Sequence, residues 1–486
     1  MWNEALEGAR VGRLWHNTAD GRVQCRLSPR NCVMSEGKRG FCGVRMNVGG
    51  KLITLNYGRS VNLTEEVIET EAVYHYKPGS RILSLGNIGC MMNCDFCHNW
   101  RTSQVRFLDE TQVHSYTPEF VVETALKRGI GMLSWTYNDP VVWQEFVIDT
   151  ARLARAHGIQ NLYKSAFYIS EEAAWELCEV MDVFSISLKS MSEEYYRRVT
   201  KGHLQPVLDA TKVVVKSGKH LEISQLLVTD LNDSEDEARK TAVWVLENCG
   251  DHVPLHFVRF HPDYKYRNVE RTPPERLFRA RDVARAEGLK WLYIGNLYQD
   301  GVADSHCPQC GHLLVRRFGL TTSASGLTES GYCARCGTAT PIMVGTLNHA
   351  SSLLEEARTQ DEFLPEETHE LKFTWANDVN AAHLTAPPLT KATVLQVLRL
   401  PQNSVERIPL GMDFGLTRCL ISRGTDNDGG IIIKYDANLD LKVLPVLDRA
   451  HFPTTESMFG EAPPRSYAAY RRELAAKNGT VTPEPL

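Results

Sequence analysis

Short apolar runs alternate with longer amphipathic segments between about residue 80 and residue 300. Runs rich in β-branched and aromatic residues are typical of buried strands, and apolar residues spaced three or four apart are typical of helices. The predicted strands are Arg81–Gly86, Gly131–Tyr137, Asn161–Tyr168, Asp182–Leu188, Leu221–Val228, Val253–Arg259 and Trp291–Ile294. The predicted helices are Pro118–Arg128, Val142–His157, Glu171–Met181, Val207–Ser217, Ser234–Asn248 and Pro274–Glu287.

This regular alternation predicts an α/β fold in which a parallel sheet is covered by helices. Its length suits a full or partial (β/α) barrel, in which active residues lie at the carboxyl ends of the strands. We expect a cysteine-containing N-terminal segment at residues 1–75, the barrel at 76–300, a zinc-ribbon-like module at 301–345 and an appendage at 346–486.

The appendage has a different pattern from the barrel and no recognisable chemistry. It begins with a charged linker or exposed helix at Glu355–Glu370 and ends with a predicted helix at Ser466–Lys477. The strand-like runs between them are Ala392–Leu398, Gly415–Arg423 and Gly430–Tyr435. These runs predict a β-rich C-terminal part.

Composition restricts the class of protein. Of the 486 residues 43% are hydrophobic and 23% charged, with a formal net charge of −5, which is typical of a soluble globular protein. No block of lysine and arginine dominates any region, which argues against nucleic acid or an anionic membrane as partner. Neither a signal peptide nor an apolar run of about 18 residues is visible, so we expect a cytoplasmic protein.

The 13 cysteines fall mostly into tight groups, which in a large chain without a signal peptide indicate metal binding or catalysis. The exceptions, Cys178, Cys249 and Cys419, are interpreted as small buried apolar residues.

The central group is Cys90, Cys94 and Cys97, separated by three residues and then two. Three thiolates this close can hold one face of a 4Fe–4S cluster. The fourth iron then stays open, and the amino and carboxylate groups of S-adenosylmethionine (SAM) could chelate it, so that one electron cleaves SAM to a 5′-deoxyadenosyl radical. The alternative is a zinc site that takes His98 as its fourth ligand. Phe96 is either a stacking partner for adenine or ordinary core.

A family resemblance adds to this interpretation. Residues Cys90–Gln104 resemble the radical SAM branch that contains the activases of pyruvate formate-lyase and other glycyl radical enzymes. More closely, residues 20–345 resemble the radical SAM member of the AmmeMemoRadiSam system. The matching stretches are Glu36–Arg45, Tyr74–Gly79, Thr136–Pro140, Pro254–Tyr264 and Gly295–Asn296.

The resemblance implies roles for four residues near SAM. Asn138 and Asp139 stand where the activases receive the SAM amino group, although Asn-Asp-Pro is also a common turn. His261 matches a histidine near the SAM nucleoside. Lys189 matches a lysine that reaches the active site, and the alternative is that Lys189 is a solvated lysine at the end of a strand. His256 could be a satisfied core histidine.

Three departures from the family separate this chain from its relatives. Ser187 replaces the Asp of an Asp-x-Lys motif that helps form a cation site, and Thr229-Asp230 replaces a Pro-Gly pair. In the N-terminal segment Cys25, Cys32 and Cys42 remain of four cysteines, and Ser28 replaces the second. These three thiols are either a metal site that uses another ligand, an empty site or ordinary loop cysteines.

Two cysteine pairs, Cys307/Cys310 and Cys333/Cys336, each lie two residues apart with glycine behind them. Two such turns predict a closed tetrahedral Cys₄ site, for which zinc is the favoured ion. The alternative to zinc at this site is an auxiliary iron–sulfur cluster.

We therefore expect a radical SAM oxidoreductase or lyase that takes hydrogen from a small-molecule or peptide substrate. The resemblance implies a flavodoxin- or ferredoxin-type electron donor and allows a partner protein, as for a glycyl radical enzyme activase. The hypothesis from another class is a zinc scaffold or nucleic-acid binder, which the lack of a basic stripe disfavours.

Overall fold

The computed structural model describes residues 8–345 fully and, beyond them, the backbone of strands between residues 368 and 445. The chain divides into two compact units, Met1–Ser351 with Ser466–Leu486, and Ser352–Arg465. The first unit contains the central motif, both cysteine pairs and the alternating strands and helices.

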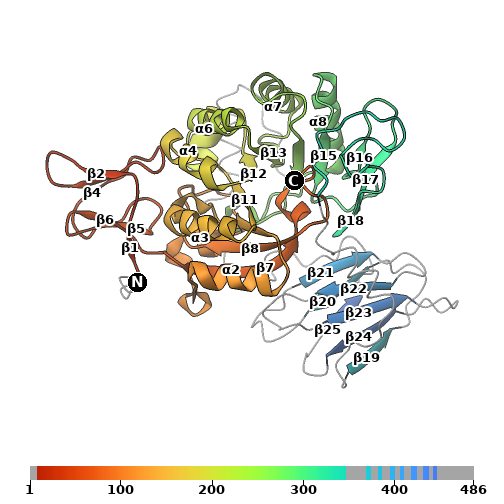
Figure 1. Ribbon diagram of the computed structural model, residues 1–486, viewed down its shortest axis with the longest axis horizontal. Helices are drawn as coiled ribbons and strands as arrows, with labels where there is room; N and C mark the ends of the chain where they lie inside the picture. The colour runs from red at the N-terminus through yellow and green to blue at the C-terminus, as the bar shows by residue number, and fades with distance from the viewer. Residues whose placement is uncertain are drawn as a thin grey trace, which may run out of the picture. The chain divides into compact units, whose positions relative to one another are not determined.

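The first unit is built around a nine-stranded sheet in the order β15-β14-β13-β12-β11-β10-β8-β7-β9 (Figure 1). Its parallel strands are β8 (Arg81–Asn87), β10 (Met132–Thr136), β11 (Gln160–Ser165), β12 (Val183–Leu188), β13 (His220–Leu227), β14 (Leu255–Arg259) and β15 (Leu292–Gly295). The edge strands β15 and β9 (His114–Ser115) do not pair, so the sheet forms a partial barrel. The predicted α/β fold with a mostly parallel sheet is confirmed.

Helices follow the strands and cover the outer face of the sheet (Figure 1). They are α2 (Pro118–Lys127), α3 (Gln144–Ala156), α4 (Glu171–Val180), α6 (Leu204–Ser217), α7 (Glu235–Asn248) and α8 (Pro274–Ala286). Side-chain oxygens of Thr117, Ser170 and Ser234 accept hydrogen bonds from the first turns of α2, α4 and α7. Such caps satisfy backbone N–H groups that have no partner inside the helix.

The residues before β8 form strands that the apolar pattern does not indicate. β7 (Arg59–Val67) pairs antiparallel with both β8 and β9 and extends the main sheet. Two small antiparallel sheets lie further toward the N-terminus. Their strands are β1 (Arg10–Val11), β5 (Arg45–Val48) and β6 (Lys51–Thr54), and β2 (Trp15–Asn17), β3 (Val23–Cys25) and β4 (Val33–Met34).

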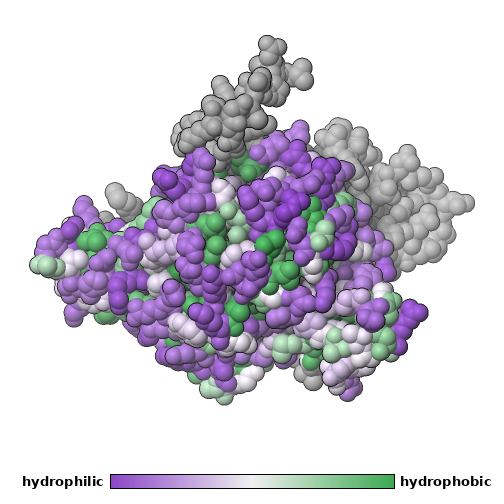
Figure 2. All heavy atoms as spheres, turned by 90° about the horizontal axis from the view of Figure 1, so that it is seen from above, coloured by the Kyte–Doolittle hydropathy of each residue, from purple (hydrophilic) through white to green (hydrophobic). Residues whose placement is uncertain are grey.

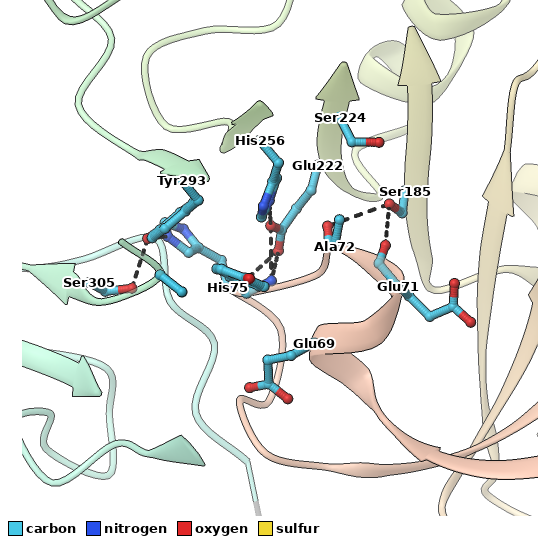
Figure 3. Close-up of polar contacts among 12 residues, drawn as sticks. Glu69, Glu71, Ala72, His75, Ser185, Glu222, Ser224, His256, Tyr293 and Ser305 are labelled. Carbon is cyan, nitrogen blue, oxygen red and sulfur yellow. Dashed lines mark hydrogen bonds and ion pairs between the residues drawn. The ribbon is translucent and has the colours of Figure 1, made fainter. Parts of the chain in front are cut away.

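A buried polar network closes the amino-terminal end of the barrel (Figure 3). The carboxylate of Glu222 on β13 is fully buried and accepts hydrogen bonds from the backbone of Tyr74 and His75 and from His256 on β14. Nε2 of His75 in turn bonds the Tyr293 hydroxyl at 2.6 Å. His256 is therefore a satisfied core histidine, because its ring is bonded to Glu222 at the end opposite the cysteine loop.

Beyond the barrel the first unit continues into a small three-stranded sheet, β16 (Ser305–His306), β17 (Leu313–Phe318) and β18 (Thr321–Ser323). Arg317 on β17 bonds the carbonyl oxygen of Tyr74 at 2.6 Å and the Ser305 hydroxyl at 2.9 Å. The small sheet is thereby joined to the polar network under the barrel.

The described strands of the second unit form two antiparallel sheets, as expected for a β-rich appendage. One has the order β19-β24-β23-β22 and the other β21-β20-β25. Their strands are β19 (Thr368–Phe373), β20 (Ala381–Thr385), β21 (Val394–Arg399), β22 (Val405–Pro409), β23 (Arg418–Arg423), β24 (Ile431–Asp436) and β25 (Lys442–Pro445). The predicted helix at Ser466–Lys477 and most of Glu355–Glu370 lie outside the described residues.

The face of the protein shown in Figure 2 is mainly hydrophilic, with hydrophobic residues scattered among polar ones. Among the described helices, none combines the length and the apolar composition that crossing a membrane requires.

Candidate active site

The loop after β8 carries Cys90, Cys94 and Cys97 across the carboxyl end of the barrel. Burial raises the pKa of all three thiols, that of Cys94 to about 12, and each thiol lies within electrostatic range of another. Metal ligation requires thiolates, so a metal bound here has to displace these protons.

Asp95, inside the cysteine motif, fixes this loop to two other strand exits. Its carboxylate accepts hydrogen bonds from Nζ of Lys265 at 2.8 Å and Nζ of Lys201 at 3.0 Å. Its backbone N–H donates to the carbonyl oxygen of Val199, and its carbonyl oxygen accepts from the N–H of Lys265, both at 3.0 Å. Four contacts therefore hold the loop between Cys94 and Cys97 against the loops that follow β12 and β14.

Asn138 lies at the carboxyl end of β10, beside the cysteine loop. Its Nδ2 donates to the carbonyl oxygen of Asn87 at 2.5 Å, and its Oδ1 accepts from the Thr102 hydroxyl at 3.1 Å. Asn99, two residues after Cys97, donates to the carbonyl oxygen of Tyr137 at 2.6 Å. These bonds join the end of β10 to both ends of the cysteine loop.

Asp139 is buried and connects β10 to β11. Its carboxylate accepts hydrogen bonds from the Ser165 hydroxyl at 2.7 Å, the backbone N–H of Ala166 at 2.9 Å and that of Val141 at 3.3 Å. Burial raises the pKa of this carboxyl, while these bonds and the nearby Lys189 lower it. All three hydrogen-bond donors are neutral, so the carboxylate has no cation in direct contact among the described residues.

Lys189 follows β12 and is half-buried. Its charge lowers the pKa of the Cys94 and Cys97 thiols and of Asp139, whose burial acts in the opposite direction. The structure thus brings Lys189 near both the cysteine loop and the end of β10.

His261 follows β14 and meets the residue after Cys97. Nε2 of His98 bonds the carbonyl oxygen of His261 at 2.9 Å, and the two rings lie 5.0 Å apart. His98 therefore points to the exit of β14, which disfavours the zinc alternative that needs it as a ligand. Nδ1 of His261 is buried and has no hydrogen-bond partner in the described part of the chain. Burial, His98 and Arg271 lower the pKa of His261 to about 4.

Phe96 is surrounded by side chains of the protein. It is 5% exposed and packs in a cluster with Tyr195, Val228, Phe260 and Tyr266. Its ring centroid lies 6.5 Å from that of Tyr195 and 6.4 Å from that of Tyr266. This packing corresponds to the core alternative that the sequence left open, rather than to a ring exposed for adenine.

The C-terminal cysteine pairs converge on one point. The sulfurs of Cys307, Cys310, Cys333 and Cys336 all lie within 4.8 Å of one another. Both pairs use the same turn: Gly311 donates its N–H to the carbonyl oxygen of Cys307, and Gly337 donates to that of Cys333, each at 2.9 Å. The geometry suits a tetrahedral metal ion.

Sequence reasoning missed Asp95, Ser165 and Arg30 as residues that organise the site. Arg30 donates through Nε to the carbonyl oxygen of Met91 at 2.9 Å. The only sequence signal was the charge of Asp95 within a motif that the fold buries, since the partners of all three are distant along the chain.

Comparisons with known proteins agree with this arrangement. Residues 84–245 match the family model of the radical SAM superfamily. The chain is 36% identical over 329 residues to the uncharacterized protein MJ0808 of Methanocaldococcus jannaschii, covering 68% of this chain and 98% of the relative. It is 21% identical over 230 residues to pyruvate formate-lyase 1-activating enzyme of Escherichia coli strain K12, covering 44% of this chain and 93% of that enzyme.

Among solved structures, a domain of a pyruvate-formate lyase-activating enzyme from Bacteroides vulgatus ATCC 8482 matches with a TM-score of 0.30 and 17% identity, covering 34% of this chain and 98% of that one. The sequence relationships, together with a partial barrel that carries three cysteines after its first parallel strand, establish the family. This chain belongs to the radical SAM superfamily, whose chemistry depends on a 4Fe–4S cluster and S-adenosylmethionine.

Proposed function

We propose that Cys90, Cys94 and Cys97 hold the 4Fe–4S cluster and that the chain takes a hydrogen atom from a small-molecule or peptide substrate. When bound, the cluster and SAM supply a 5′-deoxyadenosyl radical for this abstraction. The proposal rests on one arrangement: the cysteine loop, Asp139, Lys189 and His261 follow the carboxyl ends of four parallel strands of one sheet, β8, β10, β12 and β14.

The spacing of the three thiols fits a cluster better than a single ion. Among the described residues, the C-terminal cysteines alone form a group of three or more metal-ligating side chains whose ligand atoms lie within 4.8 Å. At least one pair of the sulfurs of Cys90, Cys94 and Cys97 is therefore more than 4.8 Å apart, which is compatible with ligands that bind different irons of one cluster. With His98 turned away, the loop offers three thiolates and leaves one iron for SAM.

Asp139 and Asn138 are proposed to hold the amino end of SAM. The ammonium group of SAM would give the buried Asp139 carboxylate the cationic partner that it lacks in direct contact, which is favourable because buried charges are stable only when paired. Asn138 fixes the end of β10 on which Asp139 stands, through its bond to Asn87 at 2.5 Å.

Lys189 and His261 are proposed to contact other parts of SAM. The ammonium of Lys189 lies near the cysteine loop and suits the SAM carboxylate. His261 is neutral at physiological pH, and the free Nδ1 of its ring offers a hydrogen bond to the nucleoside. Phe96 stabilises the loop through core packing instead.

The Cys₄ site is proposed to be a structural zinc site. Cys307 and Cys333 pack in a buried cluster with Tyr74, Trp291 and Tyr293, so a metal here would fix the small sheet to the end of the barrel. All four ligand positions are filled by protein, which leaves no open position for substrate.

The relationship to pyruvate formate-lyase 1-activating enzyme favours a second candidate, an activase that takes hydrogen from a glycine of a partner protein. Ser187 argues for a departure from that activity. Its hydroxyl lies 3.1 Å from that of Ser224, so two neutral groups stand where the related motif carries a carboxylate. We propose membership of the AmmeMemoRadiSam type, a flavodoxin- or ferredoxin-type electron donor and a cytoplasmic location.

Turnover of SAM tests the proposal directly. Anaerobically reconstituted protein is incubated with SAM and dithionite, and 5′-deoxyadenosine is measured with deuterated candidate substrates. We expect 5′-deoxyadenosine from the wild type and deuterium transfer into it from the true substrate. Cys94→Ala should abolish both, while Cys249→Ala, at a lone buried cysteine, should retain them. A colourless protein that holds only zinc contradicts the proposal.

A further inference from the structure

Three cysteines of the N-terminal segment surround one small cavity. Cys25 ends β3, Cys32 precedes β4 and Cys42 lies in the turn before β5. All three line a cavity of about 20 Å³, and Ser28 lines it as well. Residues separated by up to 17 positions along the chain are thus gathered around one point that the proposed activity does not use.

The local backbone contacts the sulfur of Cys32 and joins Cys25 to Cys32. The N–H of Phe41 donates to Sγ of Cys32 at 3.4 Å, and the N–H of Cys25 donates to the carbonyl oxygen of Cys32 at 2.9 Å. At Gly40, a Cβ would lie only 3.5 Å from Sγ of Cys32, so the turn before Cys42 packs on that sulfur. Hydrogen bonds from backbone N–H groups to sulfur stabilise thiolates in metal centres.

A buried arginine supplies positive charge at the same cavity. Arg45 lines the cavity and is 2% exposed. Its Nη2 pairs with Glu145, whereas Nε and Nη1 have no hydrogen-bond partner in the described part of the chain. Burial lowers the pKa of Arg45, but Glu145, Cys25 and Cys42 outweigh it and raise the pKa. Buried donors without partners are costly, so this site is suited to an anionic group with acceptor atoms.

The cavity also adjoins the cysteine loop of the active site. Met91, the residue after Cys90, lines it and accepts a hydrogen bond from Nε of Arg30. A Cβ at Gly89, the residue before Cys90, would meet the carbonyl oxygen of Cys42 at 2.8 Å. Arg30 lines the cavity as well, so one arginine contacts both the cavity and the cysteine loop of the active site.

We propose that Cys25, Cys32 and Cys42 ligate a second iron–sulfur cluster that delivers electrons to the cluster at Cys90. At least one pair of their sulfurs is more than 4.8 Å apart, wider than any pair in the Cys₄ site and compatible with ligands of different irons in one cluster. Three thiolates around a cluster form an anionic group, which matches Arg45 and Arg30. Ser28 lines the same cavity and would offer its hydroxyl oxygen as a fourth donor.

The electron transfer balances without further reactants. A one-electron donor, either a flavodoxin- or ferredoxin-type protein or dithionite, reduces the second cluster. That cluster is oxidised again when the same electron passes to the cluster at Cys90, so no proton or leaving group moves in this step. The relay rests on the proposed function, whereas ligation by Cys25, Cys32 and Cys42 does not.

Metal content tests the ligation. Iron, acid-labile sulfide and zinc per chain are measured in wild type, Cys32→Ala, Cys310→Ala and the matched control Cys249→Ala. We expect about eight iron and eight sulfide in the wild type, because each 4Fe–4S cluster holds four of each. Cys32→Ala should lose about half of both and keep its zinc. Cys249→Ala should lose none, and Cys310→Ala should lose only zinc. Unchanged iron in Cys32→Ala, or zinc lost from it, overturns the proposal.

Two further measurements separate the possible failures. Adding SAM should change the electron paramagnetic resonance spectrum of the cluster that remains in Cys32→Ala. Absence of a SAM effect in the wild type would count against the proposed function and not against the second cluster. If Cys32→Ala does not fold, the rate at which a chelator removes iron from Ser28→Cys tests the proposal instead. A fourth thiolate should slow the loss of half of the iron several-fold. An unchanged rate in Ser28→Cys overturns the proposal.

Discussion

Nε of Arg30 donates a hydrogen bond to the carbonyl oxygen of Met91, 2.9 Å away, and so places a guanidinium next to the residue that follows Cys90. The same arginine stacks on Phe41, with its Cζ 3.7 Å from the ring centroid. A positive charge from the N-terminal segment is therefore fixed beside the cysteine loop of the active site.

Replacing Arg30 should change the potential of the cluster proposed to bind at Cys90. A nearby positive charge favours the reduced, more negative cluster, so Arg30→Gln should lower the midpoint potential by roughly 20–60 mV. Arg30→Lys keeps the charge and should stay closer to the wild type. A redox titration followed by electron paramagnetic resonance measures the shift. Arg26→Gln, an exposed ion-pair change in the same segment, is the control. A potential that rises in Arg30→Gln contradicts the electrostatic role.

Asp95→Asn should destabilise the fold. The substitution removes the shared partner of Lys201 and Lys265, whose side chains are 28% and 15% exposed. Breaking a largely buried ion pair leaves charges without compensation, so we expect a loss of about 2 kcal/mol in the free energy of unfolding. Urea denaturation measures it. Glu123→Gln breaks the exposed pair with Lys127 and should change stability by less than about 0.5 kcal/mol. Equal effects of the two substitutions would show that the ion pairs of Asp95 with Lys201 and Lys265 do not stabilise the fold.

Removing a ligand of the Cys₄ site should loosen the small sheet and leave the active site intact. Cys310→Ala should release the zinc, because a structural site needs its four ligands. Hydrogen exchange should then accelerate at β17, which packs on this site through Leu314 and Val315. Mass spectrometry of exchange and metal analysis provide the two readouts. Protection of β17 equal to that of the wild type would show that the metal is not structural.

Stability should fall in mild acid through the buried histidines. Burial lowers the pKa of His75 and His256 below the ordinary value of 6.5. Below about pH 6.5 the unfolded chain binds protons that the folded chain excludes, so each histidine lowers the free energy of unfolding by up to about 1.4 kcal/mol per pH unit.

Urea denaturation between pH 7.5 and about pH 5 measures this slope. Burial raises the pKa of Glu71 and Asp139, which act in the opposite direction, so the informative quantity is the difference in slope between the wild type and His256→Gln. We expect a smaller acid loss in His256→Gln. The exposed His16→Gln should keep the wild-type slope. Identical slopes in all three proteins would contradict the prediction.

SAM affinity should depend on His261 but not on its protonation near neutral pH. With a pKa of about 4, the imidazole stays neutral, so the dissociation constant for SAM should be constant between about pH 6 and pH 8. His261→Ala should weaken binding about tenfold, the value of one hydrogen bond of about 1.4 kcal/mol. Equilibrium binding of labelled SAM measures both, with the exposed His114→Ala as control. Unchanged affinity for SAM in His261→Ala would show that His261 does not contact SAM.

The order of strands and helices was predictable because it is encoded locally. Each parallel strand appears within a few residues of its expected bounds, since apolar runs and capping residues act over short distances along the chain. β7 was not predicted because Arg59–Val67 contains only three apolar residues, and its place beside β8 is fixed by pairing with that strand.

By itself the sequence determined which cysteines form groups, because the three cysteines of the central motif and the members of each C-terminal pair are close along the chain and must be close in space. Only the tertiary structure decided what surrounds them. It turned His98 toward His261, buried Phe96 in the core and placed Lys265 on Asp95, 170 residues away. It also brought Cys25, Cys32 and Cys42 around one cavity next to Met91. Such contacts depend on how distant segments pack, and local patterns carry no record of that packing.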